Sequence, residues 1–98
     1  MNKNYVAGRN FEYKRKKWWE GLGYVVLRSS GSHGFADLTA IKPGYGVTFI
    51  QCKIVKTEAE GNRLISKFVE NPPIIPGNYH LAIEVYVKNL RKALSKTI

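Results

Sequence analysis

The segment from Asp37 to Lys53 constrains the fold of this chain more than any other stretch. Two short apolar runs, 38–41 and 47–50, flank the sequence Pro-Gly-Tyr-Gly at 43–46, which is typical of a turn. Apolar runs of this length on both sides of a glycine-rich turn predict a β-hairpin. We expect the rest of the chain to be organised around this hairpin.

The few polar residues of the hairpin stand at its open end. Asp37 begins the first strand, and Gln51 and Lys53 end the second. Because side chains two apart on a strand share a face, Gln51 and Lys53 project together while Cys52 points away. In a suitable register, Asp37 lies across from them. An acid, an amide oxygen and an ammonium gathered in this way suit a divalent metal together with a phosphate or a nucleophilic water.

The net charge indicates the kind of partner. The chain of 98 residues suits a single domain, and its 16 Lys and Arg outnumber 7 Asp and Glu by 9. The basic residues cluster with aromatic ones, which favours a polyanion, and nucleic acid is the usual polyanionic partner. The alternative is a charged surface that only keeps the protein in solution.

Several classes of protein are excluded. A single cysteine, Cys52, cannot form an internal disulfide and is expected to be a small core residue. One cysteine and two histidines do not make a structural zinc site of the usual kind. No apolar run is long enough for a membrane span, and the polar N-terminus does not predict a signal peptide. An intracellular, cytoplasmic protein without a membrane partner is therefore expected.

Apolar periodicity predicts a mixed α/β fold. A strand–helix–strand segment after Lys53 requires a crossover, so the sheet is expected to be mixed and flanked by helices. Residues 1–8 are expected to be a leader, with Asn10 as a helix cap. The helix at 57–70 has capping-box spacing, although Gly61 within it could move its start to about 62. The predicted order is α-β-β-β-α-β-α: helix 10–22, strand 24–27, strands 38–41 and 47–50, helix 57–70, strand 79–87 and helix 89–98.

The first helix is predicted to bury one apolar stripe. Phe11, Trp18 and Leu22 stand at i, i+7 and i+11 and are expected to face the core, while the basic run 14–17 faces outward. Adjacent tryptophans cannot share one helix face, so one of Trp18 and Trp19 is expected in the core and the other at an interface or stacked on DNA.

Four segments, taken in order, resemble a known family. They are G-R-N-F-E at 8–12, G-Y-V-V-L-R-S-S-G-S at 23–32, A-D-L-T-A at 36–40 and F-I-Q-C-K at 49–53. Together they resemble the archaeal-type Holliday junction resolvases, the Hjc group of the PD-(D/E)XK nuclease superfamily. The resemblance implies a restriction-endonuclease-like core and Mg²⁺-dependent hydrolysis of phosphodiester bonds near a branch point, with Mn²⁺ as a substitute. It further implies branched or duplex DNA as substrate, a homodimer, and a prokaryotic or viral host.

The resemblance also implies roles for individual residues. Asp37 matches the central metal ligand, Lys53 the catalytic lysine and Glu12 the acid that the first helix contributes. Gln51 stands where the family usually has glutamate, and the backbone carbonyl of Cys52 completes the oxygen ligands of the metal. Ser32 matches a loop serine near the scissile phosphate. The candidates for DNA contact are Arg9, Lys14, Arg15, Arg28, Ser30, Ser32 and His33.

Two other functions stay open. One is another small PD-(D/E)XK nuclease of replication or repair that cuts flaps or duplex DNA. The other is a non-catalytic nucleic-acid-binding module whose active site has been lost at Gln51, because a neutral amide binds metal more weakly than a carboxylate does.

Overall fold

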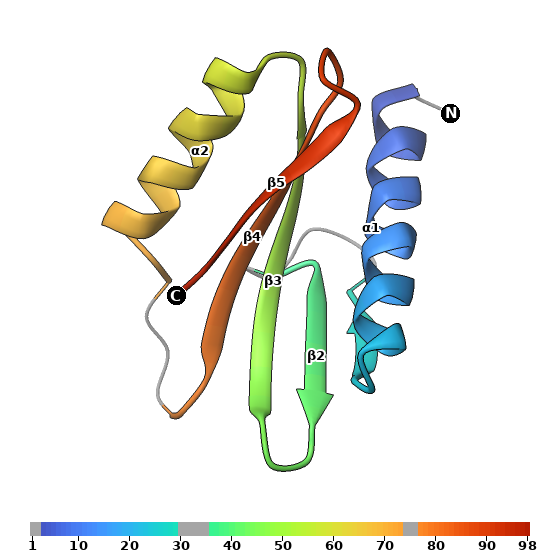
Figure 1. Cartoon of the computed structure of the whole chain (residues 1–98), viewed down its shortest axis with the longest axis vertical. Coiled ribbons are helices and arrows are strands. Elements are labelled where there is room, and N and C mark those ends of the chain that lie inside the picture. The colour runs from blue at the N-terminus through green and yellow to red at the C-terminus, as the bar shows by residue number, and fades with distance from the viewer. Residues whose placement is uncertain (1–2, 30–35, 74–76) are drawn as a thin grey trace.

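A mixed β-sheet with one helix on each face makes up the protein (Figure 1). The structure, a computed structural model, describes residues 3–29, 36–73 and 77–98. Within those residues, neither helix is long and apolar enough to cross a membrane. The elements are α1 (Lys3–Gly21), β1 (Val25–Arg28), β2 (Leu38–Lys42), β3 (Gly46–Val55), α2 (Glu58–Glu70), β4 (His80–Val87) and β5 (Lys92–Thr97).

The five strands lie in the sheet in the same order as in the chain. Neighbouring strands are antiparallel except β3 and β4, which are parallel because α2 carries the chain back across the sheet between them. The predicted hairpin is confirmed: Lys42 pairs with Gly46 at its closed end and Leu38 with Ile50 at its open end. Gly44 and Gly46 adopt positive φ angles of 85° and 86°, which explains the glycines of this turn. The expectation of a mixed α/β fold is also confirmed.

The expected helix at 89–98 is wrong, because this part of the chain forms β5. Leu90 and Leu94 are spaced four residues apart, which is typical of a helix, but only Leu94 packs against the core. The antiparallel pairing with β4 runs from Val87 opposite Lys92 to Ala82 opposite Thr97. Without β5, the backbone groups along this edge of β4 would have no partner strand. The hydrogen bonds that β5 makes with β4 therefore override the local preference for a helix.

The start of the first helix also differs from the expectation. Residues 3–8, which were expected in a leader, belong to α1, and Asn10 lies inside this helix rather than capping it; residues 1 and 2 lie outside the described residues. Ala7 and Gly8 of the additional turns line a hollow together with Ile54 of β3. The helix therefore begins earlier than predicted, at a position without a capping side chain, and its additional turns lie beside the sheet.

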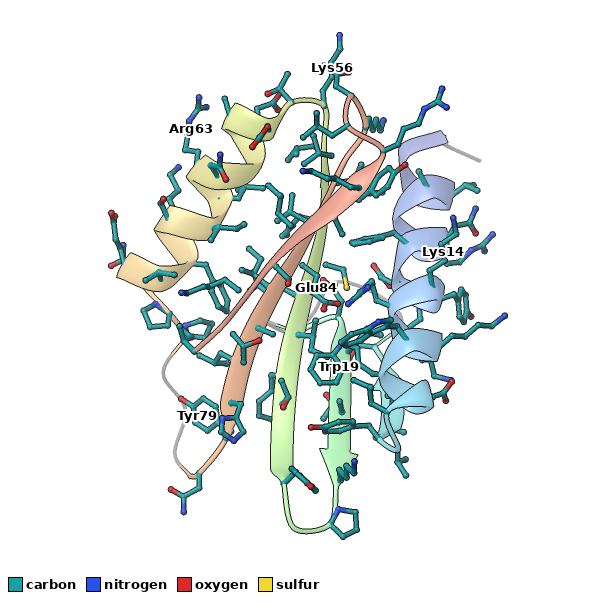
Figure 2. All side chains as sticks on the ribbon, in the orientation of Figure 1. Lys14, Trp19, Lys56, Arg63, Tyr79 and Glu84 are labelled. Carbon is teal, nitrogen blue, oxygen red and sulfur yellow. The ribbon has the colours of Figure 1, made fainter. Side chains whose placement is uncertain are left out.

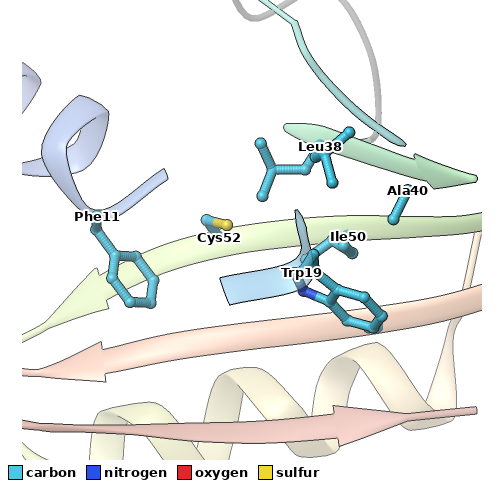
Figure 3. Close-up of a cluster of buried hydrophobic side chains, with 8 residues drawn as sticks. Phe11, Trp19, Leu38, Ala40, Ile50 and Cys52 are labelled. Carbon is cyan, nitrogen blue, oxygen red and sulfur yellow. The ribbon is translucent and has the colours of Figure 1, made fainter. Parts of the chain in front are cut away.

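One face of the sheet packs on α1. Phe11 and Trp19 of the helix are buried against Leu38, Ile50 and Cys52 (Figure 3). Cys52 is thus a core residue, as predicted.

Of the three residues of the predicted first helix that were expected to face the core, only Phe11 does so. Trp18 and Leu22 are 49% and 47% exposed, so the prediction is wrong for these two. Trp19 is the core tryptophan. The buried side of α1 therefore follows Phe11, Arg15 and Trp19, which are spaced four residues apart, and it includes a charged residue.

A buried ion pair fixes α1 on the sheet. Glu84, in the middle of β4, is 2% exposed, and both of its carboxylate oxygens accept hydrogen bonds of 2.8 Å from Arg15. Trp19 Nε1 lies 3.5 Å from the same carboxylate, and Figure 2 shows Trp19 and Glu84 in the layer between α1 and the sheet. The hydrogen bonds to Glu84 raise the pKa of Arg15. Arg15 was expected on the outer face of the helix; that expectation is wrong, because its charge compensates Glu84.

The other face of the sheet packs on α2. Thr57 caps this helix by accepting a hydrogen bond from the backbone N–H of Glu60, as the capping-box spacing predicts. The helix begins at Glu58, so Gly61 lies inside its first turns and does not delay its start. Phe68 and the neighbouring apolar residues of α2 cover Val55, Leu81, Ile83, Val85 and Val87.

Gly61 sets how closely α2 approaches the sheet. A Cβ atom there would lie 3.2 Å from Leu94 Cδ1 and 3.4 Å from Val87 Cγ2. We expect Gly61→Val to lower the free energy of unfolding by about 1–3 kcal/mol, because two further methyl groups overpack this contact. Urea unfolding followed by circular dichroism measures the change. Asn62→Val, one position along on the exposed side of α2, is the control, and an equal loss in both variants would contradict this account.

Candidate active site

The candidate site lies where β3 continues past the end of β2. The antiparallel pairing of β2 with β3 ends at Leu38 opposite Ile50, whereas β4 pairs with β3 as far as Val55. From residue 51 onward, no strand among the described residues pairs with this edge of β3. Asp37 stands at this edge, directly before β2.

Asp37 is held by hydrogen bonds to both neighbouring strands. Its N–H donates to Ile50 O at 2.9 Å, and its carbonyl accepts from Ser29 N at 2.9 Å. Its Oδ2 accepts from the backbone N–H of Cys52 at 2.8 Å and so replaces the missing strand partner. Because both backbone groups of a strand residue point to the same side, the carbonyl of Cys52 also faces this open edge. Carboxylate and carbonyl oxygens are thereby brought to one place.

Gln51 and Lys53 leave β3 on the side opposite the α1 core. Ile50 and Cys52 are buried under α1, so the residues that alternate with them project to the other face. Gln51 is partly exposed and Lys53 is exposed, which places neither in the apolar interior. Burial raises the pKa of the Cys52 thiol, and the negative charges of Glu84 and Asp37 raise it further. Cys52 therefore remains a neutral thiol, and only its backbone groups are available to the candidate site.

Glu12 reaches the same region from α1. Its Oε1 accepts a hydrogen bond of 2.9 Å from Arg28 Nε at the end of β1, and both side chains are largely buried, at 16% and 15% exposed. The guanidinium of Arg28 also lies over the ring of Tyr13, 4.9 Å from its centre. Arg28 is therefore held by a carboxylate on one side and an aromatic ring on another.

The electrostatics of Glu12 show which groups are its neighbours. Burial raises the pKa of Glu12, and the negative charge of Asp37 raises it further. The charge and hydrogen bond of Arg28 and the charge of Lys53 act in the opposite direction. One carboxylate and two cations therefore act on Glu12, although they come from the start of β2, the end of β1 and the overhanging part of β3.

The donors present fit a hard divalent cation. Among the described residues, no group of three or more His, Cys, Asp and Glu side chains gathers closely enough to hold a metal ion. Two carboxylates, Glu12 and Asp37, together with the carbonyl of Cys52 nevertheless offer oxygens of the kind that Mg²⁺ prefers, and Mg²⁺ retains several water ligands. This set lacks the nitrogen and sulfur ligands that characterise zinc sites.

Some predicted site residues lie elsewhere or outside the described structure. Lys14 is exposed on α1, Arg9 is partly buried, and Arg15 is turned toward Glu84. Ser30, Ser32 and His33 fall outside the described residues.

The bond between Arg28 and Glu12 was not predicted. One sequence signal could have suggested it. Arg28 ends an apolar strand, and only one loop separates this arginine from Asp37, the predicted metal ligand.

The comparison with protein-family models finds no family that matches this chain, and the comparison with curated proteins finds no match either.

Proposed function

We propose that this protein is a Mg²⁺-dependent, structure-selective DNA endonuclease with a restriction-endonuclease-like core, and specifically a Holliday junction resolvase. One observation carries the proposal: Asp37 accepts a hydrogen bond from the Cys52 N–H at the open edge of β3, and both Asp37 and Lys53 act electrostatically on Glu12. The net charge of +9 adds support for a polyanionic substrate.

Each residue of the site has a role in this proposal. Glu12 and Asp37 bind the ion through carboxylate oxygens, with Gln51 and the Cys52 carbonyl as neutral ligands. When bound, Mg²⁺ supplies a Lewis acid that favours hydroxide and neutralises phosphate oxygens. Lys53 orients the attacking water or balances the negative charge that develops on the phosphate. Mn²⁺, which accepts the same oxygen ligands, is expected to substitute.

The test is incubation of the protein with labelled four-way junction, flap and plain duplex DNA in Mg²⁺ or Mn²⁺. Paired nicks close to the branch point support the resolvase. Cleavage of the flap or the duplex instead favours another small nuclease of the same superfamily. Salt-sensitive binding without any cleavage contradicts the enzyme and leaves a nucleic-acid-binding module.

The proposal includes a homodimer, because symmetric nicking of a junction requires two sites and a two-fold axis supplies them. The apolar residues of the C-terminal half are one candidate for that interface. In the structure, Val25, Leu27 and Ile41 of β1 and β2 are also exposed, at 63%, 57% and 39%. Size-exclusion chromatography with light scattering measures the oligomeric state, and a monomer at the concentrations used for cleavage would contradict this part of the proposal.

Gln51→Glu tests the assignment of metal ligands. We expect the variant to bind Mg²⁺ or Mn²⁺ at least as tightly as the wild type, because it replaces a neutral oxygen with an anionic one. Isothermal titration calorimetry measures the affinity. Glu70→Gln at the exposed end of α2 is a control for surface charge, and a clear loss of affinity in Gln51→Glu would remove Gln51 from the ligands.

A further inference from the structure

A groove lies between α1, from Ala7 to Trp18, and the β4–β5 hairpin. Figure 1 shows α1 beside the turn that connects these two strands. Lys14 and Trp18 line it from the helix, and Tyr86, Lys88, Arg91 and Lys92 line it from the hairpin. This groove is separate from the candidate metal ligands, none of which contributes to its walls.

The groove carries an uncompensated positive charge. Among the described residues, Lys14, Lys88, Arg91 and Lys92 line it and no acidic residue does. None of these four has an ion-pair partner there; the ion pairs of that part of the chain involve Arg15, Lys16 and Arg28 instead. Cations that face one another without an acid repel, so an anionic ligand along the groove is electrostatically favoured.

The backbone that carries the cations of the β4–β5 turn is held in place by hydrogen bonds. The N–H of Lys88 donates to Val55 O at 2.9 Å, and the N–H of Asn89 donates to Lys56 O at 3.0 Å. Arg91 has a φ angle of 51°, and among the described non-glycine residues it alone has a positive φ. An arginine in this left-handed conformation is strained, and such strain is often found where a side chain is needed for function.

An aromatic side chain adds a second kind of contact. Trp18 is 49% exposed, and the guanidinium of Arg15 lies over its ring at 4.4 Å from the centre. Exposed aromatic rings beside basic side chains are the surfaces on which proteins stack the bases of single-stranded nucleic acid. A ligand that has both spaced negative charges and flat apolar rings fits this groove better than a simple anion does.

The groove adjoins a hollow that reaches the segment of β3 in the candidate site. Cys52 and Lys53 line this hollow, which shares Ala7, Phe11, Ile54 and Lys88 with the groove. A ligand in the groove can therefore continue along the protein surface to this segment.

We propose that this groove binds the phosphate backbone of a DNA strand that extends from the candidate active site, with an unpaired base stacked on Trp18. The inference rests on the proposed nuclease function and names the path that the substrate takes. Lys14, Lys88 and Arg91 contact phosphates, and Trp18 makes the groove selective for DNA with unpaired bases at a branch or flap.

The test compares two triple variants that lose the same charge. Lys14→Gln/Lys88→Gln/Arg91→Asn removes groove cations, and asparagine suits the left-handed backbone at position 91. Arg63→Gln/Lys67→Gln/Lys96→Gln removes three exposed cations from α2 and β5, away from the groove. Binding of a fluorescein-labelled four-way junction is followed by anisotropy over a series of salt concentrations, without divalent cations so that no cleavage occurs.

We expect the groove variant to bind more weakly, with a slope of log affinity against log salt that is smaller by about 2–3, since each lost phosphate contact lowers it by about 0.9. The control variant keeps the wild-type slope. If the salt slope changed equally in the two variants, junction binding would depend only on the overall charge of the protein, and the proposal would be overturned.

Trp18→Leu is expected to abolish the quenching of tryptophan fluorescence by a single-stranded oligonucleotide; unchanged quenching would refute the stacking. Because these experiments measure only binding, they test the groove proposal separately from the nuclease proposal. If the wild-type protein cleaves DNA but the groove variant binds the junction as tightly as the wild type does, only the groove proposal is contradicted.

Discussion

Asp37→Asn is expected to lower the rate of junction cleavage about 1000-fold or more while leaving the protein folded and able to bind DNA. In the proposed site this carboxylate is the central anionic ligand of the metal. Metal-dependent charge stabilisation is worth several kcal/mol, and each 1.4 kcal/mol is about tenfold in rate. The amide oxygen of asparagine can still accept the hydrogen bond from the Cys52 N–H, so the edge of β3 keeps its partner. Single-turnover cleavage in saturating Mg²⁺ measures the rate.

Two further variants make the Asp37 result specific. Lys53→Ala is expected to abolish cleavage as well, because it removes the ammonium beside the carboxylates. Glu58→Gln removes one acid from the exposed start of α2 and should leave the rate unchanged. Substantial residual cleavage in Asp37→Asn would mean that the chemistry takes place elsewhere on the molecule or does not depend on this ion.

Arg15→Met is expected to lower the free energy of unfolding by about 3–5 kcal/mol, the cost of leaving a buried carboxylate without its partner. Glu84 is 2% exposed and receives both of its short hydrogen bonds from Arg15. The packing of α1 on the sheet depends on that pair, so the loss should appear as one cooperative transition at lower denaturant concentration. Urea titration followed by tryptophan fluorescence measures it.

A second ion pair on the same helix provides the control. Lys16 lies 3.4 Å from Glu20 at the surface, and Lys16→Met should cost no more than about 0.5 kcal/mol. The double variant Arg15→Met/Glu84→Leu replaces both charges with apolar groups and should recover much of the stability. If Arg15→Met were no more destabilising than Lys16→Met, the buried pair would not contribute as described.

Local patterns predicted the part of the fold that local forces determine. The turn at 43–46 and the apolar runs beside it fixed the hairpin, and hairpin register placed Asp37 near the residues that follow Ile50. Period-two alternation correctly separated buried Cys52 from Lys53. These features depend on residues that are close in sequence, or on the two-residue period of a strand.

Features that depend on distant partners were not predictable in this way. Arg15 is separated from Glu84 by 69 positions, so nothing near Arg15 indicates that a basic residue belongs on the buried face of α1. The core tryptophan was ambiguous for the same reason, because the face of α1 that contains Trp19 is defined by the sheet beneath it. The C-terminal segment became a strand because β4 offered it an open edge, whereas its own leucines suggested a helix.

The bond between Arg28 and Glu12 means that the candidate site contains its own counter-ion. Two carboxylates brought together without a cation repel each other, but here a tethered guanidinium balances them and keeps their geometry. The arrangement of these side chains is therefore preorganised and does not require a bound ion. Under the proposed function, an ion that binds Glu12 competes with that guanidinium, and Arg28, once displaced, becomes available to a phosphate group. We infer that binding of the metal and binding of the substrate would then be coupled through this one side chain.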